Sequence, residues 1–240
     1  MIEIKNVTKV YGGKIKAVDQ LSLDLKPGEI FGFLGPNGAG KTTTIKMLTG
    51  IVSADEGEIT INGYTLENDA LTYKKQFGFV PDNPDTFLRL KGIEYLNFMG
   101  DIYEVEPKLR KERIEDLAKR FDMTNALGDH ISSYSHGMRQ KIVLIGALIH
   151  NPSLWILDEP MTGLDPKSSF YLKEMMREHA DQGNVVFFST HVLEVAEKIC
   201  DRVGIINKGK LTFCGTMAEL RETVSDNEGL ENIFLEMTND

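Results

Sequence analysis

Nine residues near the start of the chain combine glycines with a lysine and two threonines at a fixed spacing. Residues 35–43 read GPNGAGKTT and match the pattern GxxxxGK(S/T). Glycines allow a tight turn whose backbone N–H groups, together with a helix N-terminus, face an anion. The Lys41 ammonium would then bind β- and γ-phosphates, and the Thr42 hydroxyl would bind Mg²⁺. The pattern predicts a phosphate-binding loop formed by Gly35, Pro36, Asn37, Gly38, Ala39, Gly40, Lys41, Thr42 and Thr43.

Two adjacent carboxylates follow a second apolar run. Residues 154–159 read LWILDE, so Asp158 and Glu159 stand at the end of a run typical of a buried strand. Asp158 could orient a Mg²⁺-bound water, and Glu159 could polarise the attacking water as a general base. Such a pair also commonly starts an ordinary loop. Its place after a phosphate-binding loop, on a second buried strand, favours the catalytic interpretation.

Buried strands must position these groups. Residues 30–34, 154–157, 185–188 and 203–206 are short, nearly all-apolar runs. Strands buried on both faces have this pattern, which predicts a largely parallel sheet covered by helices. The phosphate-binding loop follows the first run directly and precedes a helical run at residues 44–48. This strand-loop-helix order is the context that the motif requires.

Two further regions differ from this α/β pattern. Apolar residues alternate within residues 2–7 and 21–25, and Asn62-Gly63 after residues 57–61 is a hairpin signal, so an N-terminal antiparallel β subdomain is expected. Between about residues 86 and 150, apolar residues recur at helical spacing, and Pro107 suits a first helical turn. We expect an inserted α-helical subdomain there.

The C-terminal residues have a pattern of their own. Leu230, Ile233, Phe234 and Met237 follow the i, i+3, i+4, i+7 spacing of an amphipathic helix. The prediction is therefore one domain over residues 1–225 followed by a helix at 226–240, which either docks on its own domain or contacts another subunit.

Composition restricts the function classes. The chain has 240 residues and a formal net charge of −9, which disfavours broad electrostatic binding of nucleic acid. It contains no apolar run of membrane-spanning length and no secretory signal pattern, so a cytoplasmic location is expected. Cys200 and Cys214 have no metal-ligand or CxxC spacing, so neither a disulfide framework nor a zinc site is expected.

Residues 133–140 read SYSHGMRQ and precede the acidic strand by the length of one helix. Residues 134–138, the signature segment, resemble the LSGGQ signature of the ABC (ATP-binding cassette) ATPases. This resemblance implies an α/β fold with a P-loop NTPase (RecA-like) core. It also implies that Ser135 and Gly137 contact the γ-phosphate of ATP, and that His136 and Met138 belong to the same ATP-binding segment.

Other residues extend the resemblance over nearly the whole chain. Tyr11 lies where the family places an aromatic ring against adenine, although a strand-end aromatic is an ordinary feature. Residues 163–165 read GLD and resemble the D-loop, which makes Asp165 a candidate contact residue. His191 resembles the switch histidine that contacts the γ-phosphate. A lone histidine is more often structural, but this one closely follows the apolar run at 185–188.

Three positions depart from the family pattern. His136 replaces the first signature glycine, and Met138 replaces the final glutamine. Asp82 stands in VPDNP, where the Q-loop glutamine is expected. Asp82 could serve Mg²⁺ with a hard oxygen, or could organise the turn, or Asn83 could supply the missing amide. Thr42, Asp158 and Asp82 are accordingly the candidate metal residues.

The resemblance implies a Mg²⁺-dependent ATPase in which two subunits clamp two ATP molecules. Glu159 would be the base and His191 the γ-phosphate partner, and the motion would drive a permease on a separate chain at the inner face of the cell membrane. Residues 79–103 and the tail look like those of drug- and lipid-exporter subunits. The alternatives are a soluble single-cassette ATPase, for example in iron–sulfur cluster assembly, and a nucleotide-binding protein without turnover, which the intact Lys41, Asp158, Glu159 and His191 disfavour.

Overall fold

Two β-sheets form the framework of the molecule. The computed structural model describes residues 1–222. Within them, an antiparallel sheet has the order β2-β1-β4 and is formed by β1 (Ile2–Tyr11), β2 (Ile15–Leu25) and β4 (Glu56–Ile61). The second sheet has the order β5-β6-β7-β3-β8-β9. Its strands are β3 (Ile30–Leu34), β5 (Phe77–Val80), β6 (Leu154–Asp158), β7 (Val185–Thr190), β8 (Arg202–Asn207) and β9 (Lys210–Gly215).

The second sheet is parallel apart from one edge strand. β9 pairs antiparallel with β8, and the other neighbours pair parallel. Every residue of β3, β6 and β7 is buried, as the all-apolar runs predicted. Because these strands run in the same direction, the residues that follow their carboxyl ends meet at one edge of the sheet. The phosphate-binding loop, the acidic pair and His191 all follow these ends.

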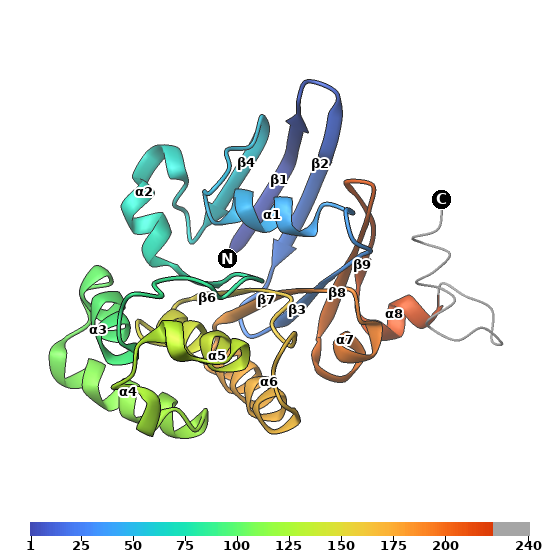
Figure 1. Cartoon of the computed structure of the whole chain (residues 1–240). Coiled ribbons are helices and arrows are strands. Elements are labelled where there is room, and N and C mark those ends of the chain that lie inside the picture. Colours follow the sequence, from blue (N-terminus) through green and yellow to red (C-terminus); the bar gives the residue numbers. More distant parts are fainter. Residues whose placement is uncertain (223–240) are drawn as a thin grey trace.

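Helices cover both faces of the parallel sheet (Figure 1). On one face, α1 (Lys41–Leu48) lies between the two sheets and buries Ile45, Met47 and Leu48 in a core shared with β1, β2 and β3. On the other face, α5 (His136–Leu148) and α6 (Pro166–Asp181) pack against Trp155, Leu157 and strand β7. α1 therefore joins the phosphate-binding loop to both sheets.

The predicted helical region contains α3 (Gly92–Ile102), α4 (Pro107–Arg120) and α5, with short 3₁₀ turns at Thr124–Ala126 and Ile131–Ser133. Pro107 begins α4, as its missing N–H and fixed φ favour. Leu96 of α3, Ile114 of α4 and Phe121 just after α4 are buried in the core that α5 and α6 share.

The hairpin expected at Asn62-Gly63 is only partly present. Both residues have positive φ, 51° and 85°, as a tight hairpin turn requires. However, the pairing stops at a single Ile61–Tyr64 bridge. The reason lies three residues further on, where Thr65 and Asn68 form a capping box that begins α2 (Leu66–Lys75). The predicted second strand is therefore a helix.

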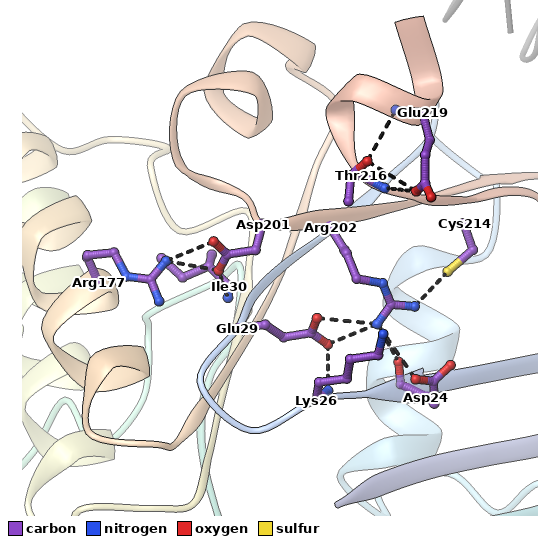
Figure 2. A network of polar contacts seen from close by, with 10 residues as sticks. All are labelled: Asp24, Lys26, Glu29, Ile30, Arg177, Asp201, Arg202, Cys214, Thr216 and Glu219. Carbon is purple, nitrogen blue, oxygen red and sulfur yellow. Dashed lines mark hydrogen bonds and ion pairs between the residues drawn. The ribbon is translucent and has the colours of Figure 1, made fainter. Parts of the chain in front are cut away.

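A network of charged side chains ties the base of β3 to distant segments (Figure 2). Glu29, which is 5% exposed, accepts a hydrogen bond from Lys26 N and pairs with Arg202 at 3.3 Å. Arg177 on α6 donates to Asp201 and to the carbonyl of Gly28. The network therefore links the β2–β3 turn to α6 and β8. Two short helices complete the described chain: α7 (Leu193–Ile199) precedes β8, and α8 (Met217–Glu222) follows β9.

Two predictions from the sequence concerned membrane-spanning segments and the C-terminal residues 226–240. No helix of residues 1–222 combines the length and the apolar character needed to cross a bilayer. The amphipathic helix predicted at 226–240 lies outside the described residues.

Candidate active site

The phosphate-binding loop closes tightly around its own lysine. Gly40 caps α1 with φ 115°, and a Cβ at this position would lie 2.5 Å from the carbonyl oxygen of Ala17, so only glycine fits. The helix begins at Lys41, three residues before the run predicted at 44–48. The Lys41 ammonium donates to the carbonyls of Gly35 at 2.6 Å and Pro36 at 3.2 Å. Its side chain is only 6% exposed, so its charge is held inside the loop.

A cavity of about 200 Å³ lies over this loop. Most of the predicted loop residues line it, and so do Asp82 and Glu159, which come from other segments. The lining residues are Ala17, Pro36, Asn37, Gly38, Gly40, Lys41, Thr42, Thr43, Asp82 and Glu159. A larger cavity, of about 340 Å³, lies between α4 and α6 and is lined by none of the predicted site residues. The chemistry of the lining side chains, rather than size, marks the smaller cavity as the functional one.

Asp158 is the buried acid of the site. Its side chain is 3% exposed and accepts a hydrogen bond from Ser189 Oγ at 2.6 Å. Burial raises the pKa of Asp158, and the nearby charges of Asp82 and Glu159 raise it further, while hydrogen bonds from Ser189 and Thr42 oppose the shift. The carboxylate is thus crowded by negative charge, which a bound cation would offset.

Glu159 occupies a strained backbone position next to it. Its φ is 48°, in the left-handed region that non-glycine residues rarely adopt. Its N–H donates to Ser189 Oγ at 3.0 Å, which helps to hold this conformation. Its carboxylate lies 3.1 Å from His191 Nδ1 and 3.5 Å from Lys41 Nζ. The structure thus brings Lys41, Glu159 and His191 together from three segments of the chain.

Ser189 was not singled out from the sequence. Its hydroxyl bridges the two acidic residues, since it donates to Asp158 and accepts from the backbone of Glu159. The available signal was weak: a polar residue that follows the apolar run at 185–188, in register with Asp158 on the neighbouring strand.

The segment after β5 distinguishes Asp82 from Asn83. Asp82 lines the cavity together with Lys41 and Glu159. Asn83 is exposed, and its side-chain oxygen accepts a hydrogen bond from Asp85 N at 2.9 Å. The side chain of Asn83 therefore organises the turn, and the carboxylate at position 82 is the group near the phosphate-binding loop.

The signature segment lies at the start of α5 and not beside the phosphate-binding loop of its own chain. Ser135 caps α5, where its side chain accepts from Met138 N at 3.3 Å, so His136, Gly137 and Met138 form the first helical turn. The helix expected between this segment and the acidic strand thus begins within the segment, at His136. Among the described residues, none of the signature segment lines the cavity over the phosphate-binding loop.

Tyr11 and Asp165 do not line that cavity either. Tyr11 is 41% exposed at the end of β1, with Lys9 Nζ 5.8 Å from the centre of its ring. Asp165 caps α6 by accepting from Ser168 N at 2.9 Å, and it pairs with Lys141 at 3.1 Å.

Comparison with known proteins identifies the family. The family model described as "ABC transporter" matches residues 18–162, more than half of the 240 residues. The chain belongs to the ABC transporter family. Among its ABC relatives, the linearmycin resistance ATP-binding protein LnrL of Bacillus subtilis (strain 168) is 37% identical over 220 residues, which are 92% of this chain and 70% of LnrL.

Two further ABC proteins match over nearly their full lengths. The ABC-type transporter ATP-binding protein EcsA of Bacillus subtilis (strain 168) is 34% identical over 239 residues, 99% of this chain and 96% of EcsA. A solved structure of an ATP-binding subunit of an ABC transporter is 31% identical, with a TM-score of 0.94 and 99% of each chain covered. The predicted ABC family and its P-loop NTPase fold are confirmed.

Proposed function

We propose that this chain is the Mg²⁺-dependent ATPase subunit of an ABC membrane transporter, which closes with a second ABC subunit around two ATP molecules and drives a permease on a separate chain. The observation that carries the proposal is the convergence of Lys41, Glu159 and His191 beside the phosphate-binding loop. These are a phosphate-binding cation, a base and a hydrogen-bonding partner for the base, the groups that ATP hydrolysis requires.

Mg²⁺ fits the oxygen groups beside the loop. No group of three or more His, Cys, Asp or Glu side chains within residues 1–222 is arranged to hold a metal ion alone. The Thr42 hydroxyl, which opposes the rise in the pKa of the Asp158 carboxyl, and the Asp158 carboxylate itself offer hard oxygens, to which ATP phosphates would add the rest. Asp82, on the same cavity wall, would assist directly or through water. Bound there, Mg²⁺ would neutralise charge on the phosphates.

The protein's own groups suit the hydrolytic step. Glu159 would accept the proton of the attacking water, and its left-handed backbone fixes where its carboxylate points. His191 would orient that carboxylate and contact the γ-phosphate. Lys41 is drawn towards Glu159 at 3.5 Å, and the phosphates of ATP would compete for this cation.

A second subunit would complete each site. The signature segment and Asp165 lie away from the cavity of their own chain, so we assign Ser135, His136, Gly137, Met138 and Asp165 to the ATP bound by the partner subunit. Tyr11, exposed at the end of β1, would stack on adenine.

The permease would contact an apolar surface formed by α3 and the segment before it. Phe87, Phe98 and Ile102 are 46%, 42% and 50% exposed. The rings of Phe87 and Phe98 are 5.7 Å apart, and Ile102 is one helical turn beyond Phe98, so the three form one patch. An exposed patch of large apolar side chains is typical of a protein interface. Asp82 lies in the segment that connects the cavity to this patch.

The location would be the inner face of the cell membrane, held there by the permease. Export is favoured because LnrL is named for linearmycin resistance, and because residues 79–103 look like those of exporter subunits. The alternative, a soluble single-cassette ATPase in iron–sulfur cluster assembly, is disfavoured because EcsA and the similar solved structure carry transporter names.

Glu159→Gln tests the proposal. Glutamine keeps the shape and removes the base, so turnover should fall by ~10²–10⁴, or about 3–5 kcal/mol of barrier. ATP binding should persist, and the variant should accumulate as an ATP-bound dimer in size-exclusion chromatography. Near-normal phosphate release by the variant would refute the assignment of Glu159.

A further inference from the structure

The signature segment packs against residues 163–165 of its own chain. His136 is the first residue of α5, and its ring lies against Gly163. A Cβ added to Gly163 would overlap the ring at Cδ2 and lie 2.8 Å from Nε2. The ring therefore occupies the space that a side chain at position 163 would need.

Two more contacts hold the same loop. A Cβ added to Gly137 would lie 2.9 Å from the carbonyl oxygen of Gly163, so the two backbones approach closely. One turn further along α5, Lys141 Nζ lies 3.1 Å from Asp165 Oδ2. Hydrogen bonds from Ser168 and the ion pair with Lys141 hold the pKa of Asp165 well below its usual range. Asp165 therefore stays charged as the cap of α6 and as the partner of α5.

The residues at 136 and 163 complement each other in size. Gly163 has φ 77°, in the left-handed region, so a side chain there would be strained as well as crowded. His136 stands where the family signature has its first glycine. Because Gly163 has no side chain, it leaves room for the larger residue at position 136, and the His136 imidazole fills that space.

We infer that His136 is a positioning residue, which couples the signature segment to residues 163–165 so that both approach the ATP of the second subunit as one rigid unit. This inference rests on the proposed function, because it requires a two-subunit site. Without the ring, Gly163 loses the side-chain contact that holds it and must be ordered each time the dimer closes. Ordering one residue costs roughly 1–2 kcal/mol, equivalent to about a five- to thirtyfold rise in the ATP concentration for half-maximal activity.

The test compares His136→Ala with His136→Phe. Alanine keeps the helix and removes the ring, so the half-saturating ATP concentration should rise roughly five- to thirtyfold, with kcat changed much less because Ser135 and Gly137 remain. Phenylalanine retains a flat ring without nitrogen atoms, so it should restore most of the wild-type value. ADP binding by single subunits should stay the same in both variants, because His136 does not line the cavity of its own chain.

Gly163→Ala supplies a second, independent measurement. The new Cβ would push the ring away, so Gly163→Ala should impair ATP saturation more in the wild-type background than in the His136→Ala background. Gly183→Ala is the matched control, since Gly183 has φ 87° but no atom within 4 Å of an added Cβ. It reports the strain of positive φ alone.

Equal impairment by alanine and phenylalanine at position 136 would overturn the inference, because the nitrogens would then matter rather than the packing. Equal cost of Gly163→Ala in both backgrounds would also overturn it. Failure of the proposed function looks different: wild-type protein would show neither turnover nor ATP-dependent dimers, and both ideas would fall.

Discussion

The Nδ1 atom of His191 lies 3.1 Å from each carboxylate oxygen of Glu159. This contact joins the end of β7 to the end of β6 and fixes the direction of the proposed base. His191→Ala should therefore lower kcat by ~10-fold or more, equivalent to about 1.4 kcal/mol of barrier, while ADP affinity changes little because ADP lacks the γ-phosphate that His191 would contact. The measurement is steady-state phosphate release with parallel nucleotide titration. The exposed neighbour Val192→Ala is the control, and equal loss in the two variants would contradict the role of His191.

Asp82 should affect the metal dependence of turnover. Asp82 lines the cavity, whereas Asn83 bonds within its own turn. Asp82→Ala should raise the Mg²⁺ concentration for half-maximal ATPase activity, and Asn83→Ala should leave it nearly unchanged. Titration of Mg²⁺ at saturating ATP measures both. An unchanged Mg²⁺ dependence for Asp82→Ala, with a large loss of turnover for Asn83→Ala, would move the Q-loop role to Asn83.

Arg202→Met should destabilise the fold in a pH-dependent way. Burial raises the pKa of Glu29, and Arg202 opposes this shift by pairing with it. Removing one partner of a buried pair costs about 3–5 kcal/mol, because the other charge stays uncompensated. The pKa of the Glu29 carboxyl is higher in the folded chain than in the unfolded chain. Its contribution to stability is therefore present below the unfolded-state pKa and is lost as the pH rises through the folded-state pKa. The destabilisation of Arg202→Met should therefore be larger at pH 8 than at pH 5.5.

Urea unfolding at the two pH values measures this difference. The control is Arg177→Met, whose partners Asp181 and Asp201 are exposed; it should cost about 1 kcal/mol or less. A loss for Arg202→Met that is the same at both pH values would show that Glu29 is not the cause.

His179 should make stability fall in acid. It is 5% exposed on α6, edge-on to Trp155, and burial lowers its pKa from 6.5 to about 4. Between these values the unfolded chain binds a proton that the folded chain does not, so stability falls as pH drops through this window, by at most about 1.4 kcal/mol per pH unit. His179→Leu should reduce the slope. Met175→Leu on the same helix controls for repacking, and parallel slopes for wild type and His179→Leu would contradict the assignment.

Local patterns predicted much of this architecture. The phosphate-binding loop, the acidic pair and the four buried runs are each encoded within a few consecutive residues, and each lies where the sequence indicated. β9 was missed because its residues alternate between exposed and partly buried positions at a sheet edge, and β5 because it is only four residues long. The Asn62-Gly63 turn was predicted correctly, but the N-cap at Thr65 starts a helix where a second strand was expected.

The remaining features depend on contacts between distant residues. Ser189 acts on Glu159 across two neighbouring strands, 30 positions away in sequence. The packing of His136 on Gly163 likewise appears only when α5 and the start of α6 come together. A single sequence offers no periodicity or spacing that reports such pairs.

Mixing two inactive variants tests most directly whether each ATP site is shared between subunits. Lys41→Ala removes the phosphate-binding cation, and Ser135→Arg blocks the signature segment, so each variant alone should lack ATPase activity. In a mixed dimer both lesions fall on one site and leave the other intact. Phosphate release should therefore recover in part on mixing. Continued inactivity of a mixture in which heterodimers are demonstrated would contradict it.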